Sequence, residues 1–333
     1  MSLRGTLRSI AAAQRRAERE SIRKQRELEQ RRIQLEKMQE VERVAYEVET
    51  FENYIDTITS IQKDCADDWD WEKIKLSRLP SMPSRSNKFE GSAQAALESY
   101  EPKFMDKILG RTENKREELE EKIKEGKIRD INEYNEALKE YKQEYANWEL
   151  IVNLAEKILD GDEEAYSEAI RQADPFSEIS QLGSAINFNI KGNKLIETSL
   201  KVHSDKVIPH EVKTQLKSGK LSIKDMPKTR FYGLYQDYVC GAVLRIAREL
   251  CALLPIDIAI VTAIGELLNT KTGYIEEEPI LSVIIPRATL KKLNFEMLDP
   301  SDAMENFIHN MRFLKTKGFR PVQKLLPSDI EKI

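Results

Sequence analysis

The stretch TRFYGLYQDYVCGAVLRIARELCALLPIDIAIVTAI, residues 229–264, decides the fold of the C-terminal half of this chain. Residues 229–254 form a long apolar run with helical spacing. Pro255 ends this run, because proline has no amide hydrogen for a helix interior. Residues 256–264 are apolar and rich in β-branched side chains, which favours a buried strand. We therefore expect a long helix followed directly by a strand.

Alternating segments on both sides of this stretch predict two β-hairpins. Residues 186–190 and 196–202 alternate between apolar and polar side chains, and residues 191–194 supply turn chemistry between them. The strand 256–264 and an apolar run at 279–285 flank a second turn at 269–273. Strands grouped as hairpins around one helix indicate an α+β domain over 185–333 with a mostly antiparallel sheet. Short helices are expected at 209–217, 289–293 and 301–313.

The first 62 residues read as one long helix, or as two helices joined in line, and the charge of this segment is segregated. Between Met1 and Lys37 there are eleven basic and five acidic residues, although the whole chain has a net charge of −4. An acidic part follows, and it carries an apolar stripe at 44–61. Basic side chains on a helix can neutralise phosphates, so the candidate nucleic-acid-binding residues are Arg15, Arg16, Arg19, Arg23, Lys24, Arg26, Arg31 and Arg32. A solvated helix with ion pairs four residues apart, such as Glu20–Lys24 and Glu27–Arg31, is the slightly favoured explanation.

The middle of the chain predicts a linker followed by a helical or coiled-coil region. Residues 63–93 contain prolines, serines and the acidic Asp67–Glu72 run, from which Trp69 and Trp71 are expected to dock on the body of the protein. Residues 94–174 read as helical, with a break near Gly126. A heptad seam follows that break, formed by Tyr134, Leu138, Tyr141, Tyr145, Trp148 and Val152. The seam fits antiparallel packing within the chain or a dimer equally well.

Composition and motifs argue against most enzyme classes. Three scattered cysteines without CxxC spacing indicate a reducing compartment. The start of the chain has no signal-peptide pattern, and no apolar run spans a bilayer, so we expect a cytoplasmic protein. The three histidines lack zinc spacing, and no phosphate-binding loop or nucleophile motif occurs. We therefore expect neither a metal nor a cofactor.

Two pairs of charged residues each have a functional and a structural interpretation. Glu197 and Lys201 share a face of the second predicted strand, and a metal-dependent nuclease needs carboxylates and a lysine at such a position. A surface-charged sheet is the favoured explanation. Arg245 and Glu249 are four residues apart on the long helix, which favours an ion pair on its outer face over a partner-binding patch.

The last 110 residues or so resemble a module found in uncharacterised bacterial proteins. The resemblance rests on LYQDYVC at 234–240, RIAREL at 245–250, LLP at 253–255, TG at 272–273, ILSV at 280–283 and LDP at 298–300. Some of those proteins carry restriction-endonuclease-like or mobile-element-linked domains. The resemblance implies a bacterial protein with a part in defence or DNA transactions, and it transfers no catalytic residue.

Three functions follow as hypotheses. The favoured one is a non-enzymatic assembly or adaptor protein whose helical region drives self-association or docks a protein partner. The first alternative is nucleic-acid binding through the basic N-terminal helix, and the second is a divergent metal-dependent nuclease. No membrane partner is expected.

Overall fold

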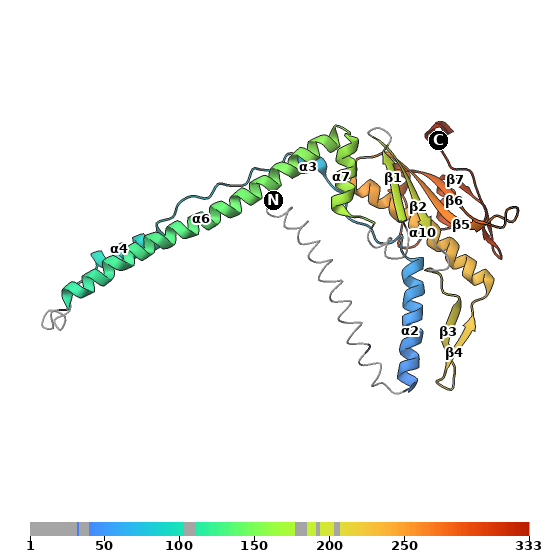
Figure 1. Cartoon of the computed structure of the whole chain (residues 1–333), viewed down its shortest axis with the longest axis horizontal. Coiled ribbons are helices and arrows are strands. Elements are labelled where there is room, and N and C mark those ends of the chain that lie inside the picture. The colour runs from blue at the N-terminus through green and yellow to red at the C-terminus, as the bar shows by residue number, and fades with distance from the viewer. Residues whose placement is uncertain are drawn as a thin grey trace. The chain divides into compact units, whose positions relative to one another are not determined.

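The computed structural model describes residues 32, 40–102, 111–176, 185–190, 194–202 and 207–332 (Figure 1). The chain divides into two units. In the described residues, the first is a helical unit formed by 73–102 and 111–153. The second is a larger α+β unit formed by 40–72 and 154–332. The predicted α+β class is confirmed.

The α+β unit is built on a five-stranded sheet with the order β1-β2-β5-β6-β7. Its neighbours pair antiparallel except for β2 and β5, which run parallel. Both expected hairpins are present, and the second is longer than its apolar runs suggested. The strands are β1 (Ala185–Ile190), β2 (Leu195–Val202), β5 (Ile258–Leu268), β6 (Ile275–Pro286) and β7 (Ile308–Met311).

Helix α10 (Lys228–Leu253) covers one face of this sheet and supplies most of the core (Figure 1). Tyr238, Leu244 and Leu250 are fully buried in it. The helix contacts β5, whose alternate residues Ala259 and Val261 are also fully buried. The expected helix at 229–254, its end before Pro255 and the strand after it are therefore confirmed.

The C-terminal segment covers the second face of the sheet. Ile260 and Ile284 form a buried cluster there with Leu325. The Thr262 and Ser282 hydroxyls lie 2.9 Å apart, and the Leu325 amide donates to the Ser282 oxygen at 3.0 Å. These bonds satisfy polar groups in the middle of an apolar face, which is the condition for burying them without a large penalty.

The α+β unit also contains helix α2 (Glu40–Thr59) and a two-stranded β-ribbon that is separate from the five-stranded sheet. The predicted stripe on α2 packs against α10 and β3, and Val44 and Ile58 are its buried members. The ribbon consists of β3 (Glu211–Gln215) and β4 (Leu221–Asp225). The helix expected at 209–217 was therefore wrong. Ser218-Gly219 makes a turn there, and Gly219 has a φ of 81° that glycine adopts without strain.

Three short elements lie near the sheet, and one of them differs from expectation. α7 (Glu163–Ala173) begins at Asp162, whose carboxylate accepts from the Ala165 amide at 2.7 Å. α11 (Arg287–Leu290) follows β6 directly. The helix expected at 301–313 was wrong, because only the 3₁₀ turn η1 (Asp302–Asn306) forms before the chain joins the sheet as β7.

The C-terminal region ends in small elements. β8 (Phe313–Leu314) pairs with β9 (Gly318–Phe319), and η2 (Pro327–Lys332) closes the described chain. Among the described residues, no helix combines the length and the apolar character that crossing a bilayer requires.

The helical unit contains α4 (Lys88–Glu98) and most of α6 (Thr112–Leu159). The boundary between the two units in the sequence falls within the short helix α3 (Trp71–Lys75), between Glu72 and Lys73. The break expected near Gly126 was wrong, because α6 runs through this glycine without interruption for 48 residues. Glycine costs about 1 kcal/mol in a helix relative to alanine, so its presence there needs a packing reason.

Candidate interaction surface

The N-terminus of α4 is held by a carboxylate from α6. Asp130 is buried, and its two carboxylate oxygens accept from the amides of Phe89 at 3.1 Å and Glu90 at 2.9 Å. Asn87, the residue that precedes α4, makes no capping bond with its own side chain. Asp130 on α6 therefore caps the N-terminus of α4 in place of a residue of α4 itself. Its carboxylate also places a negative charge at the positive end of the α4 dipole.

Gly126 explains how the two helices come so close. A Cβ atom at this position would lie 2.8 Å from the backbone carbon and oxygen of Phe89. Backbone atoms cannot rotate away, so only glycine permits this approach. The Arg129 guanidinium then stacks over the Phe89 ring, 4.0 Å from its centroid. One turn of α6 thus contains the glycine that permits the close approach of α4 and the two charged residues, Arg129 and Asp130, that contact it.

An extended segment, residues 76–87, lies on the predicted seam of α6. The Trp148 indole donates to the Ser77 carbonyl at 3.3 Å, and the Arg85 guanidinium lies 5.1 Å from the centroid of the Tyr134 ring. Along the seam, the ring centroids of Tyr141 and Tyr145 are 6.1 Å apart, and those of Tyr145 and Trp148 are 5.8 Å apart. The structure leaves all six seam residues half-buried: Tyr134, Leu138, Tyr141, Tyr145, Trp148 and Val152.

The helical unit has no apolar core of its own. Within 73–102 and 111–153, the described part of this unit, no apolar side chain is buried. Six large apolar side chains are instead exposed by 46% to 79%: Leu76, Leu79, Met82, Ile128, Ile131 and Leu150. We call these six residues the apolar set. A partner that covered it would remove apolar area from water, which is the main favourable term in association.

The candidate nucleic-acid residues of the N-terminal helix fall almost entirely outside the described residues. This applies to Arg15, Arg16, Arg19, Arg23, Lys24, Arg26 and Arg31. Arg32 is described, and it is helical and exposed. Nucleic-acid binding by this segment stays a prediction.

Glu197 and Lys201 share the face of β2 as expected, but each pairs with a different group. Glu197 meets Lys324 of the C-terminal segment at 3.4 Å, and Lys201 pairs with Glu277 and lies 3.8 Å from Glu266. The hydrogen bond to Glu277 raises the pKa of Lys201, which favours its charged form. Across the described residues, no group of three or more histidine, cysteine or acidic side chains is placed to hold a metal. The nuclease hypothesis stays a prediction.

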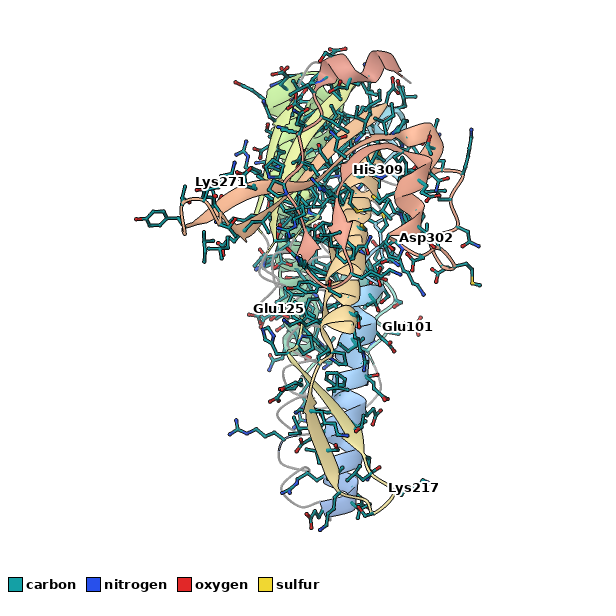
Figure 2. The ribbon with its side chains drawn as sticks, turned by 90° about the vertical axis from the view of Figure 1, so that its right-hand side faces the viewer. Glu101, Glu125, Lys217, Lys271, Asp302 and His309 are labelled. Atoms are coloured by element: carbon teal, nitrogen blue, oxygen red, sulfur yellow. The ribbon has the colours of Figure 1, made fainter. Side chains whose placement is uncertain are left out.

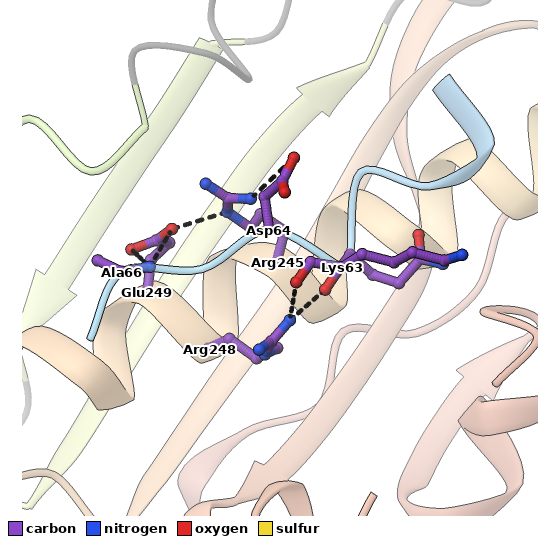
Figure 3. Close-up of polar contacts among 7 residues, drawn as sticks. Lys63, Asp64, Ala66, Arg245, Arg248 and Glu249 are labelled. Carbon is purple, nitrogen blue, oxygen red and sulfur yellow. Dashed lines mark hydrogen bonds and ion pairs between the residues drawn. The ribbon is translucent and has the colours of Figure 1, made fainter. Parts of the chain in front are cut away.

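The charged residues of α10 hold the chain's own segment 62–66 (Figure 3). Arg245 Nε lies 2.7 Å from Glu249 Oε1, and both side chains are buried. Glu249 also accepts from the Ala66 amide, at 3.3 and 3.4 Å for its two oxygens. The Arg248 guanidinium donates to the Gln62 and Lys63 carbonyls. The expected ion pair is real, but its position on the outer face was wrong.

The acidic segment after α2 docks as its two tryptophans predicted. The Trp71 indole donates to the Leu253 carbonyl at 2.6 Å, and the Trp69 amide donates to Ala252 at 2.7 Å. Asp67 and Asp68 are exposed, and Asp68 pairs with Arg287 and Lys291. The Asp68 carboxylate therefore helps to dock this connecting segment.

Sequence reasoning missed Asp130 and the extended segment as parts of the candidate surface. The one available signal was Gly126, a glycine inside an otherwise strong helical pattern, which often marks a close approach. Comparison of the chain with family models, curated proteins and solved structures gives no match.

Proposed function

We propose that this chain is a non-enzymatic assembly or adaptor protein whose helical unit associates with another polypeptide. The observation that carries the proposal is the absence of buried apolar side chains over 73–102 and 111–153, next to the exposed apolar set. Ordering each residue of a chain costs about 1 to 2 kcal/mol of backbone entropy. A long helix with little of its own surface buried gains little to offset that cost, and most helical stability in proteins comes from packing.

A second copy of this chain is the first partner to test. Light scattering should give a mass above that of one chain. The double substitution Ile128→Glu and Ile131→Glu should return the mass to one chain, because both exposed side chains lie on α6 within the apolar set. Met297→Glu is the matched control, since Met297 is 82% exposed and lies in the α+β unit.

If the double substitution leaves the association unchanged, Ile128 and Ile131 are not part of the contact. Nucleic-acid binding through the N-terminal helix is a separate candidate function, and it stays a prediction, as does the bacterial defence or DNA-transaction setting.

A further inference from the structure

The β3–β4 ribbon and the start of α10 carry an unusual concentration of positive charge for an acidic chain. Between Glu211 and Arg230 there are six basic residues and two acidic ones, against a net charge of −4 for the whole chain. Four of the basic residues lie on the ribbon or its loop, namely Lys213, Lys217, Lys220 and Lys224, and Lys228 and Arg230 lie in the first turn of α10. Figure 2 shows the ribbon beside α2, with Lys217 at its tip.

One face of the ribbon is occupied by α2. Lys213 pairs with Glu47 of α2 at 3.6 Å, and the Gln215 amide donates to the Val41 carbonyl at 3.2 Å. Because strand residues alternate between faces, Glu211 shares this face with Lys213 and Gln215. Asp225 is the cross-strand partner of Glu211 and lies on the same face. Both acidic residues of the ribbon therefore lie on the face that meets α2.

The opposite face is basic and hydroxylated. Val212 pairs across the ribbon with Lys224, and Thr214 pairs with Ser222, so these four residues lie on the face away from α2. Lys217 and Lys220 lie in the loop that joins the two strands, and both are exposed. This face carries no carboxylate.

These lysines differ from the paired cations elsewhere in the chain. Lys194, Lys201, Lys291 and Lys324 each have a carboxylate within 4 Å. Within the described residues, none of Lys217, Lys220, Lys224, Lys228 or Arg230 has one. Like charges gathered without local neutralisation repel one another, and an anion that binds them relieves the repulsion.

We propose that the β3–β4 ribbon binds the phosphates of duplex DNA without reading its sequence. A two-stranded antiparallel ribbon fits the major groove of B-form DNA, whereas the major groove of A-form RNA is too narrow for it. Lysine, serine and threonine side chains are common phosphate contacts. The face has no aromatic residue on which a single strand would stack, which favours a duplex over a single strand. This inference goes beyond the proposed function and does not depend on it.

The test compares two charge-matched variants of the full chain. Lys217, Lys220 and Lys224 are replaced by Gln in the first. Lys271, Lys315 and Lys317, which are exposed residues away from the ribbon, are replaced by Gln in the control. Fluorescence anisotropy of a labelled DNA duplex is measured over a salt series for each. Thermal melting checks that both variants fold, which we expect because all six side chains are exposed.

We expect the unchanged chain to bind the duplex with an affinity that falls as salt rises. The ribbon variant should lose about 2 to 3 from the slope of log affinity against log salt, since each phosphate contact contributes about 0.9. The control variant should keep the original slope. The absence of DNA binding at low salt, or an equal slope in both variants, would overturn the proposal. Competition by polyglutamate as strong as by duplex DNA would also overturn it, because it would indicate an acidic protein partner.

Discussion

Gly126 and Gly91 make a matched pair at the residue scale. Both are helical glycines of the helical unit, but a Cβ atom at Gly126 would meet the Phe89 backbone at 2.8 Å, while a Cβ atom at Gly91 would meet nothing within 4 Å. We expect Gly126→Ala to loosen the docking of α4 by about 1 to 3 kcal/mol, the usual cost of overpacking. Gly91→Ala should instead stabilise α4 by up to about 1 kcal/mol.

Hydrogen exchange of the α4 amides measures both glycine effects. Protection should fall in Gly126→Ala and rise or stay constant in Gly91→Ala. Equal responses at the two positions would show that helix propensity, and not the close approach, governs this contact.

The buried pair of Arg245 and Glu249 gives a second prediction at this scale. Arg245 is 8% exposed and Glu249 is 2% exposed, so removal of one charge leaves the other in a poorly solvated place. Arg245→Gln should lower the free energy of unfolding by roughly 3 to 5 kcal/mol. Chemical denaturation measures this loss. A loss below about 1 kcal/mol would mean that the pair behaves like an exposed ion pair.

Asp237 on α10 predicts a dependence of stability on pH. Burial and the nearby carboxylates of Asp299 and Asp302 raise its pKa from 3.8 to about 6, against a smaller lowering by the Ser301 hydroxyl. Between these two values the folded state binds more protons than the unfolded state does. The contribution of this group to stability is therefore present below about pH 4 and is lost as pH rises through about 6.

Asp237→Asn should remove this dependence. At pH values well above 6 it should raise stability by on the order of 1 kcal/mol, a value reduced for solvent screening of a half-buried group. Well below pH 4 it should have little effect. Denaturant titrations at both ends of the range measure the difference, and the same effect at both ends would contradict the assignment to Asp237.

At the scale of elements, the sequence predicted what is set by local pattern. The α10 helix, its end at Pro255 and the hairpin of β1 and β2 follow from periodicity and turn residues within a few positions. The ribbon of β3 and β4 was missed although its residues alternate. The contacts that stabilise the ribbon come from α2, where the Val41 side chain lies beside Gly219. Because these two residues are far apart in the sequence, a local pattern does not reveal their contact.

Other elements depend on partners that a local pattern does not reveal. β7 is a strand because its backbone pairs with the edge of the sheet at β6. This pairing outweighs the helical pattern of residues 301–313. The seam of α6 was predicted as a set of residues, but its cover could not be. Trp148 meets Ser77 through a backbone carbonyl, and a carbonyl carries no sequence signal. Asp130 likewise reads as an ordinary surface carboxylate until α4 is placed on it.

At the scale of the whole molecule, the two units differ in what holds them together. The α+β unit has a core built from α10 and both faces of the sheet, including Leu244, Val261 and Ile284. The helical unit is held by backbone capping, ring contacts and one close approach of two helices. Local stability follows buried apolar contacts, so the two units are expected to open independently and with different free energies.

Hydrogen exchange of the full chain over a dilution series, with the mass measured at each concentration, tests the central claim most directly. In a single chain, the amides of α6 between 113 and 150 should exchange far faster than those of α10. They should become protected when the chain associates with a second copy or with an added partner. A chain that stays monomeric at every concentration, with α6 protected as strongly as α10, would contradict the account, because the helical unit would then be stable without a partner.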